Sequence, residues 1–252
     1  MRQTIEPTYV TGPALPEDVS TVAPEPVAGP VENLVFDMGG VLMTFDGEYF
    51  SRAFTDTEED ARLLFHALFG RSEWSLLDAG VISHATMRRL AAARLPERLL
   101  PNLDACIEGW PALSEPLEAV NELAIRMKGE GMGVYLLSNA STRIGEQLDH
   151  MPAFPYLDGW AASAFLRTMK PDPAIYRMFC ERYGLDPASC LFIDDNANNC
   201  EGARVAGMRA FRYTGDVQAL EEAIDEARAG GVPGVGANAV QAETAPKEVP
   251  DA

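Results

Sequence analysis

The sequence has few basic side chains, few histidines and few cysteines for its 252 residues. Its 20 Lys and Arg stand against 38 Asp and Glu, which gives a formal net charge of -18 at pH 7. Nucleic acids and anionic membrane surfaces are bound by basic faces, so this balance argues against both as partners. No apolar run approaches the roughly 20 residues of a membrane-spanning helix, and no signal-peptide pattern opens the chain. We therefore expect a soluble, cytoplasmic protein.

Cysteine and histidine lack the spacing of the sites that they usually build. The four cysteines show no Cys-x-x-Cys spacing, and the three histidines are scattered through unlike contexts. We expect reduced, mostly buried thiols and no nucleophile that depends on histidine.

The two ends of the chain differ in composition from the middle. Residues 1–31 are rich in proline, and residues 229–252 are mostly Gly, Ala, Val, Pro and Glu. Neither has an apolar period, and such segments bury too little apolar surface to offset the entropy lost on ordering. We predict a disordered tail at each end.

Five short apolar segments between the tails are typical of strands. Three of them end in polar residues: 34–37 in Asp37, 133–139 in Ser138 and Asn139, and 190–195 in Asp194 and Asp195. The other two are 160–163 and 209–212. Helical segments at 116–127, 173–183 and 198–206 separate them, and Ser114 is the expected N-cap of the first. This alternation predicts an α/β fold with a doubly wound, Rossmann-like parallel sheet.

Residues 47–113 have almost no strand signal. Helical patterns occur at 58–69, 83–95 and 99–107. A long insertion that folds into its own helices directly after the first strand is typical of a lid. We predict a small helical cap domain at 47–113 on a core domain of residues 32–46 and 114–228.

The polar strand ends converge in such a sheet. The carboxyl ends of parallel strands lie on one edge, where open α/β sheets bind ligands. Lys170 follows the predicted strand at 160–163, the third in chain order, and joins Asp37, Ser138 and the pair Asp194–Asp195 there. Three carboxylates this close raise each other's pKa unless a cation lies among them, and Mg²⁺ favours such oxygen ligands.

Each of these residues alone has an ordinary explanation. Asp37 and Ser138 suit turns or helix caps, and a lysine before proline is usually a solvated loop residue. Residues 194–199 suggest a calcium loop, but the sixth position is Asn199 instead of glycine and the twelfth is Val205 instead of glutamate. The combination therefore carries the prediction.

Four motifs together resemble the haloacid dehalogenase (HAD) superfamily of hydrolases, over residues 33–213. They are Phe36-Asp37-Met38-Gly39-Gly40-Val41, Leu136-Leu137-Ser138-Asn139, Lys170-Pro171-Asp172-Pro173 and Phe192-Ile193-Asp194-Asp195-Asn196. Within it the chain looks most like the α-D-glucose-1-phosphate phosphatase-like branch, which has a helical cap after the first strand. Asp194-Asp195-Asn196 and Glu201-Gly202-Ala203 carry that finer resemblance.

The resemblance implies a Mg²⁺-dependent phosphatase that hydrolyses a small phosphorylated metabolite, with a sugar phosphate as the expected substrate. Asp37 would attack phosphorus to form an aspartyl-phosphate, and Lys170 would neutralise the charge. The remaining roles are implied residue by residue: Ser138, Asn139, Lys170 and Gly40 would bind substrate; Asp37, the Gly39 carbonyl, Asp195 and, in support, Asp194 would hold Mg²⁺; Asn199 would lie behind these ligands.

One position departs from the family pattern. Most phosphatases of the superfamily carry a second aspartate two residues after the nucleophile, which protonates the leaving group, and here that position is Gly39. Loss of such a group typically costs about 10²–10⁴ in rate. An anomeric sugar phosphate, whose leaving group is good, would tolerate the loss. Asp46 is either a replacement acid or an ordinary loop residue.

Two other functions stay open: a non-catalytic binding or regulatory protein, which Gly39 favours, and a haloacid dehalogenase, which needs no Mg²⁺. Trp74, Asp78 and Trp110 are candidates to face the site from the insertion, although core packing is the favoured role of both tryptophans. The sequence determines neither the phosphate ester nor the oligomeric state.

Overall fold

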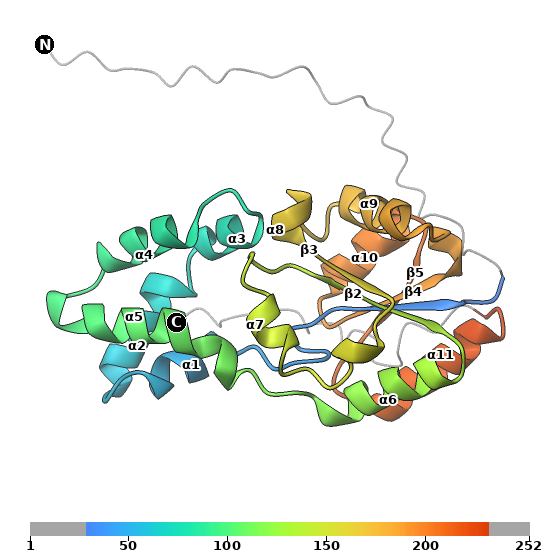
Figure 1. Cartoon of the computed structure of the whole chain (residues 1–252), viewed down its shortest axis with the longest axis horizontal. Helices are drawn as coiled ribbons and strands as arrows, with labels where there is room; N and C mark the ends of the chain where they lie inside the picture. The colour runs from blue at the N-terminus through green and yellow to red at the C-terminus, as the bar shows by residue number, and fades with distance from the viewer. Residues whose placement is uncertain (1–28, 232–252) are drawn as a thin grey trace, which may run out of the picture.

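A computed structural model describes residues 29–231, and the five predicted strands form one parallel sheet in it (Figure 1). The strands are β1 (Asn33–Phe36), β2 (Gly133–Ser138), β3 (Gly159–Ala162), β4 (Cys190–Asp194) and β5 (Arg209–Arg212). Their order is β3-β2-β1-β4-β5, and every neighbouring pair is parallel. The order reverses between β1 and β4, so the crevice at the carboxyl ends of these two strands is the expected ligand site.

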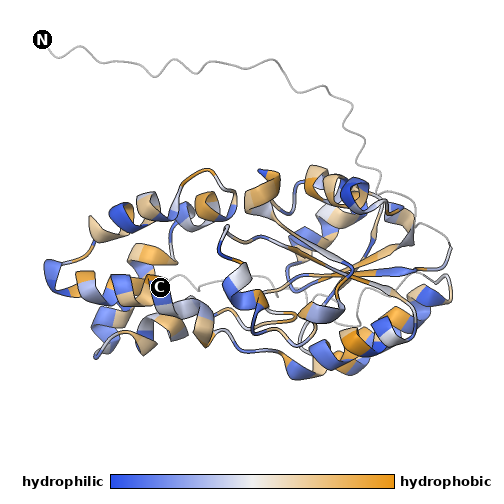
Figure 2. Cartoon of the chain, in the orientation of Figure 1, coloured by the Kyte–Doolittle hydropathy of each residue, from blue (hydrophilic) through white to orange (hydrophobic). Residues whose placement is uncertain are grey.

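Helices cover both faces of the sheet, as predicted for a doubly wound fold. One face packs against α6 (Glu118–Gly129) and α11 (Val217–Arg228), and the other against α9 (Pro173–Tyr183) and α10 (Ala197–Val205). In Figure 2, α6 and α11 carry both hydrophobic and hydrophilic residues, as helices with one buried face do. Short elements complete this part: α7 (Gly145–Leu148), η3 (Phe154–Tyr156), α8 (Ser163–Leu166) and η4 (Pro187–Ser189).

Residues 34–36 of strand β1 form an unbroken apolar run because both faces of the sheet are covered. Leu34 and Phe36 pack in the core under α6 and α11, whereas Val35 packs in the core under α9 and α10. All three side chains are fully buried. Successive strand residues point to opposite faces, so only a sheet covered on both sides requires an apolar residue at each position.

The segment between β1 and α6 folds into helices with a core of their own. These helices are α1 (Gly47–Ala53), α2 (Glu58–Leu68), α3 (Ser72–Asp78), α4 (His84–Ala92), η1 (Glu97–Leu99), α5 (Leu100–Gly109) and η2 (Trp110–Leu113). Leu64, Leu68, Met87 and Leu103 form the centre of this core. Figure 1 shows the helices together at the end of the sheet where β1 leads into α1, which places them beside the polar strand ends.

The structure decides two local predictions. The prediction that Ser114 caps a helix is wrong, and Asp46 is found to be a helix cap. Ser114 does not cap α6, which begins at Glu118; its hydroxyl instead donates to the Thr44 carbonyl at 2.6 Å. The two chain segments that join the insertion to the sheet are paired here, since the Thr44 N–H also donates to the Glu115 carbonyl. Asp46 is the N-cap of α1 and accepts hydrogen bonds from two backbone N–H groups.

Most of the two predicted tails lies outside the described residues. Of the last three residues of the first tail, Val31 is buried, and its N–H donates to the Ala227 carbonyl at 3.0 Å. All four cysteines are buried and none forms a disulfide. Among the described helices none has the length and apolarity to cross a membrane.

Candidate active site

Three carboxylates and one ammonium group meet at the switch point of the sheet. Asp37 follows β1, Asp194 ends β4 and Asp195 comes next, and each offers an oxygen within 4.8 Å of the others. Lys170 Nζ lies 2.8 Å from Asp37 Oδ1 and 2.7 Å from Asp194 Oδ2. The structure thus brings together the strand-end residues that the topology predicted.

Asn139 fixes the backbone of Lys170. Its Nδ2 donates to the Lys170 carbonyl and its Oδ1 accepts from the Lys170 N–H, each at 2.9 Å. Beyond Lys170, a Cβ on Gly202 of α10 would lie 2.0 Å from the Pro171 carbonyl oxygen, so only glycine allows this approach. The Lys170 side chain is fully buried, and its Nζ lies 5.2 Å from the centre of the Phe192 ring. The lysine that the sequence alone would leave in a solvated loop is therefore held rigidly in the interior.

Asp194 is directed inward and all its hydrogen-bonding capacity is used. Besides Lys170, its carboxylate accepts from Asn199 Nδ2, 3.1 Å from both oxygens, and from the Asn196 N–H at 2.8 Å. Asp195, in contrast, is exposed and lines the cavity. Its pKa is raised by partial burial and by the charge of Asp194.

Asp37 presents one oxygen to the cavity. Its Oδ1 accepts from the Met38 N–H at 2.6 Å and lies against Lys170, whereas Oδ2 accepts no hydrogen bond within residues 29–231. Burial raises the pKa of Asp37 to about 7; Lys170 opposes this shift and Asp194 adds to it. The pKa of Lys170 is raised too, because the two carboxylates outweigh the effect of burial, which lowers it.

The charges fit a bound divalent cation. Three ionised carboxylates and one ammonium leave a local charge of about -2, in a place where the nearby carboxylate raises the pKa of Asp37. A hard cation with oxygen ligands removes that repulsion, and Mg²⁺ is the typical ion of such sites. Asp37 and Asp195, which both line the cavity, are the residues placed to hold it.

The two glycines after Asp37 differ in what they contribute. Gly40 has φ +75°, and a Cβ there would lie 2.6 Å from Asp195 Oδ2, so glycine leaves room for that carboxylate. Its N–H donates to the Met43 carbonyl at 2.8 Å, so the proposed role of Gly40 in substrate binding is not performed by this N–H group. At Gly39 a Cβ would meet only the Cβ of Phe45, at 3.4 Å.

These groups open into a cavity of about 310 Å³, the size of a small-ligand site. Strand ends and the insertion both line it, with Asp37, Met38, Gly39, Gly40, Phe45, Trp74, Asp78, Trp110, Ser138, Asn139, Ala140, Ser141, Gln147 and Asp195. The tryptophans, which the sequence assigned to core packing, take both roles: they pack on the core of the insertion and line the cavity. Their ring centres lie 5.6 Å apart.

Sequence reasoning missed Phe45, Ser141 and Gln147. Ser141 follows the end of the predicted strand at 133–139 by only two residues, so its position was a usable signal. Phe45 and Gln147 had none, because nothing in the local pattern shows which side of the segment faces the cavity.

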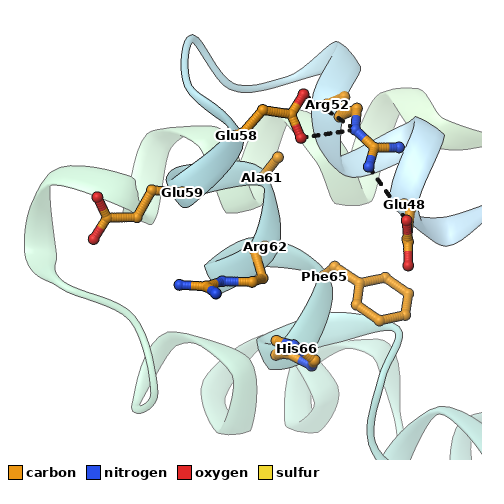
Figure 3. Close-up of a pocket in the computed structure, with 8 residues that line it drawn as sticks. All are labelled: Glu48, Arg52, Glu58, Glu59, Ala61, Arg62, Phe65 and His66. Atoms are coloured by element: carbon orange, nitrogen blue, oxygen red, sulfur yellow. Dashed lines mark hydrogen bonds and ion pairs between the residues drawn. The ribbon is translucent and has the colours of Figure 1, made fainter.

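A second, larger cavity of about 500 Å³ lies along α1 and α2 (Figure 3). Arg52 forms ion pairs there with Glu48 at 3.3 Å and Glu58 at 3.1 Å, and all three side chains are largely exposed. This cavity is lined by none of the four clustered residues Asp37, Lys170, Asp194 and Asp195. It is an exposed groove with solvated charges, which contribute little energy.

Known proteins that resemble this chain include a phosphatase and a dehalogenase. Phosphatase MT3486 of Mycobacterium tuberculosis is 29% identical over 201 residues, which cover 72% of this chain and 86% of that protein. (S)-2-haloacid dehalogenase 4A of Burkholderia cepacia is 29% identical over 112 residues, 42% of this chain and 43% of that enzyme. The crystal structure of the HAD family enzyme BT-2542 of Bacteroides thetaiotaomicron matches with a TM-score of 0.58 at 25% identity, covering 77% of this chain and 99% of that one.

BT-2542 has also been solved in complex with magnesium and inorganic phosphate, a structure that is 22% identical and has a TM-score of 0.58, with 74% of this chain and 96% of that one covered. Residues 31–207 match the family of haloacid dehalogenase-like hydrolases. With its parallel sheet and its cluster of Asp37, Lys170 and the acidic pair, this chain belongs to the haloacid dehalogenase-like hydrolase family.

Proposed function

We propose that this hydrolase is a Mg²⁺-dependent phosphatase that cleaves a small phosphomonoester through an aspartyl-phosphate. One observation carries the proposal: Asp37 Oδ2 faces the cavity without a hydrogen-bond partner among the described residues, while Oδ1 is held by Lys170 and the Met38 N–H. A nucleophile needs such an oriented and unengaged lone pair. The phosphatase from M. tuberculosis and the phosphate complex of the Bacteroides enzyme support the same chemistry.

Four residues have separate roles in the proposed reaction. Asp37 Oδ2 forms a bond to phosphorus while the bond from phosphorus to the ester oxygen breaks, and water then releases phosphate from Asp37. Lys170 stays charged and offsets the negative charge of Asp37 and the phosphoryl group. Ser138, which is buried and lines the cavity, binds a phosphoryl oxygen through its hydroxyl. Asn139 acts by positioning Lys170.

Mg²⁺ would be held by Asp37, Asp195 and the Gly39 carbonyl, and it would neutralise the carboxylates and the phosphoryl oxygens. Asp194 and Asn199 support these ligands from the interior, since Asn199 fixes the carboxylate of Asp194. Carboxylates that cluster at this density favour a phosphatase over a dehalogenase, which has no use for a divalent cation.

The substrate class that we propose is a sugar phosphate, in an enzyme of the α-D-glucose-1-phosphate phosphatase-like branch. Trp74 and Trp110 give the cavity an apolar wall, and Ser141, Gln147 and Asp78 add polar groups to it. A ring with an apolar face and several hydroxyl groups matches this mixture. Residues 47–113 would act as the cap that covers the bound ester.

The test is phosphate release from p-nitrophenyl phosphate and from a panel of sugar phosphates, with and without Mg²⁺. We expect turnover that requires Mg²⁺ and is abolished by Asp37→Asn, which keeps the shape of the side chain but removes its nucleophilic charge. Halide release from 2-haloacids is measured in parallel. No phosphate release from any ester would contradict the proposal, and halide release without Mg²⁺ would establish a dehalogenase.

A further inference from the structure

The leaving oxygen of an ordinary phosphate ester needs a proton, and Gly39 has no side chain to give it. The cavity that holds Asp37 is lined by three titratable side chains, Asp37, Asp78 and Asp195. Asp37 is the proposed nucleophile and Asp195 a proposed metal ligand. Asp78 is therefore the remaining acid that faces this cavity within residues 29–231.

Asp78 is held firmly where the insertion meets the sheet. It is the last residue of α3, and its carbonyl accepts from the Ser163 hydroxyl at 2.6 Å. Two residues on, Gly80 packs so closely that a Cβ would lie 2.5 Å from the Ala164 carbonyl oxygen. These contacts join α3 to α8, which follows β3, so the position of Asp78 relative to the strand ends is fixed by packing.

Burial of the Asp78 carboxyl favours its protonated form. The residue is only 8% exposed, although it lines the cavity. Burial raises its pKa to about 8, and the hydrogen bond from the Ser141 N–H opposes the shift. Other charged groups are near: Asp37 and Asp195 share the cavity, His84 and Arg143 line a small cavity that also touches Ser141, and Arg167 binds the Gly80 carbonyl. None of them contributes to the shift of Asp78.

We propose that Asp78 of the insertion is the general acid and base of this active site, in place of the acid that is absent at position 39. The inference rests on the proposed phosphatase function. As Asp37 Oδ2 bonds to phosphorus, the Asp78 proton passes to the departing ester oxygen, which leaves as an alcohol. The Asp78 carboxylate then takes a proton from the water that attacks phosphorus, Asp37 is released, and phosphate departs with Asp78 protonated again.

The experiment compares Asp78→Asn with the wild type on esters of one size with different leaving groups, a p-nitrophenyl and an alkyl phosphate, in Mg²⁺. The p-nitrophenolate ion is stable enough to leave without a proton, whereas an alkyl leaving group must be protonated as it departs. We expect kcat/KM for the alkyl ester to fall about 10²–10⁴-fold and that for the p-nitrophenyl ester to fall far less. A merely structural role would lower both alike, and equal losses would overturn the proposal.

Asp46→Asn is the matched control. Asp46 is the N-cap of α1, the first helix of the same insertion, and an asparagine N-cap retains its hydrogen bonds to the Glu48 and Tyr49 N–H groups. This variant should keep the wild-type ratio of the two activities, and a selective loss of the alkyl ester here would assign the acid to Asp46 and overturn the proposal.

The pH dependence of the wild type provides a second test, which does not require that any variant folds. The ratio of kcat/KM for the alkyl ester to that for the p-nitrophenyl ester should fall as the pH rises through about 8, because only the alkyl ester needs the protonated Asp78. A ratio that stays constant would contradict the assignment. A wild type inactive on both esters would refute the proposed phosphatase instead, so the two failures are distinct.

Discussion

Gly40→Ala has two effects that can be measured separately. The new methyl group takes the space that the Asp195 carboxylate occupies, and a residue with a side chain is strained at the positive φ of this turn. The methyl group would lie 2.6 Å from Asp195 Oδ2 and 2.9 Å from its Cγ. Asp195 is exposed, so it relieves the clash by rotating out of the cavity at little cost in stability. The remaining cost is that of φ +75°, about 1–2 kcal/mol for a residue with a side chain. For a domain of this size that corresponds to a decrease in Tm of about 2–8 °C.

Gly131→Ala is the matched control, because Gly131 has φ +91° and a Cβ there would meet no atom within 4 Å. Thermal unfolding should show similar losses for both alanine variants. Titration calorimetry with Mg²⁺ should show affinity lowered at least about tenfold, the scale of disturbed metal sites, in Gly40→Ala alone. Equal Mg²⁺ affinity in the two variants would refute Asp195 as a ligand that needs this space. A much larger loss of stability in Gly40→Ala would show that Asp195 is unable to move.

Three further changes test the packing and the charges. Gly202→Ala forces a methyl group onto the Pro171 carbonyl and should lower the free energy of unfolding, measured by urea denaturation, by about 1–3 kcal/mol. Gly145→Ala is the control: a Cβ at Gly145 would meet no atom within 4 Å, so this variant should not destabilise the protein. Lys170→Met leaves two buried carboxylates without their ammonium partner and should lower the free energy of unfolding by about 3–5 kcal/mol in the absence of Mg²⁺. Thermal unfolding in which added Mg²⁺ restores none of this stability would show that the metal assignment is wrong. Asp78→Asn should gain stability relative to the wild type by on the order of 5 kcal/mol as the pH rises from about 4 to 8. The unfolded wild type releases the Asp78 proton above pH 3.8, whereas burial raises the folded-state pKa to about 8, so the wild type loses stability across this range. The same stability difference between the two proteins in urea denaturation at both ends of the range would exclude this.

The core of the site could be predicted because its placement follows from topology. Asp37 and Asp194 end parallel strands, and such ends converge whatever the remaining packing is. The unbroken apolar runs also indicated a sheet covered on both faces, as Leu34 and Val35 show by packing on opposite sides.

The sequence alone therefore determined the sheet, its polar edge and the family motifs, all of which depend on local patterns and on strand order. Tertiary structure alone decided how the insertion meets that edge, because a helical pattern marks a buried face without showing what covers it. It turned Trp74 and Trp110 toward the cavity, and it used the Ser114 hydroxyl at the junction instead of at a helix cap. It also buried Asp78 in the wall of the cavity that the proposed nucleophile lines, where the loss of solvation raises the pKa of its carboxyl.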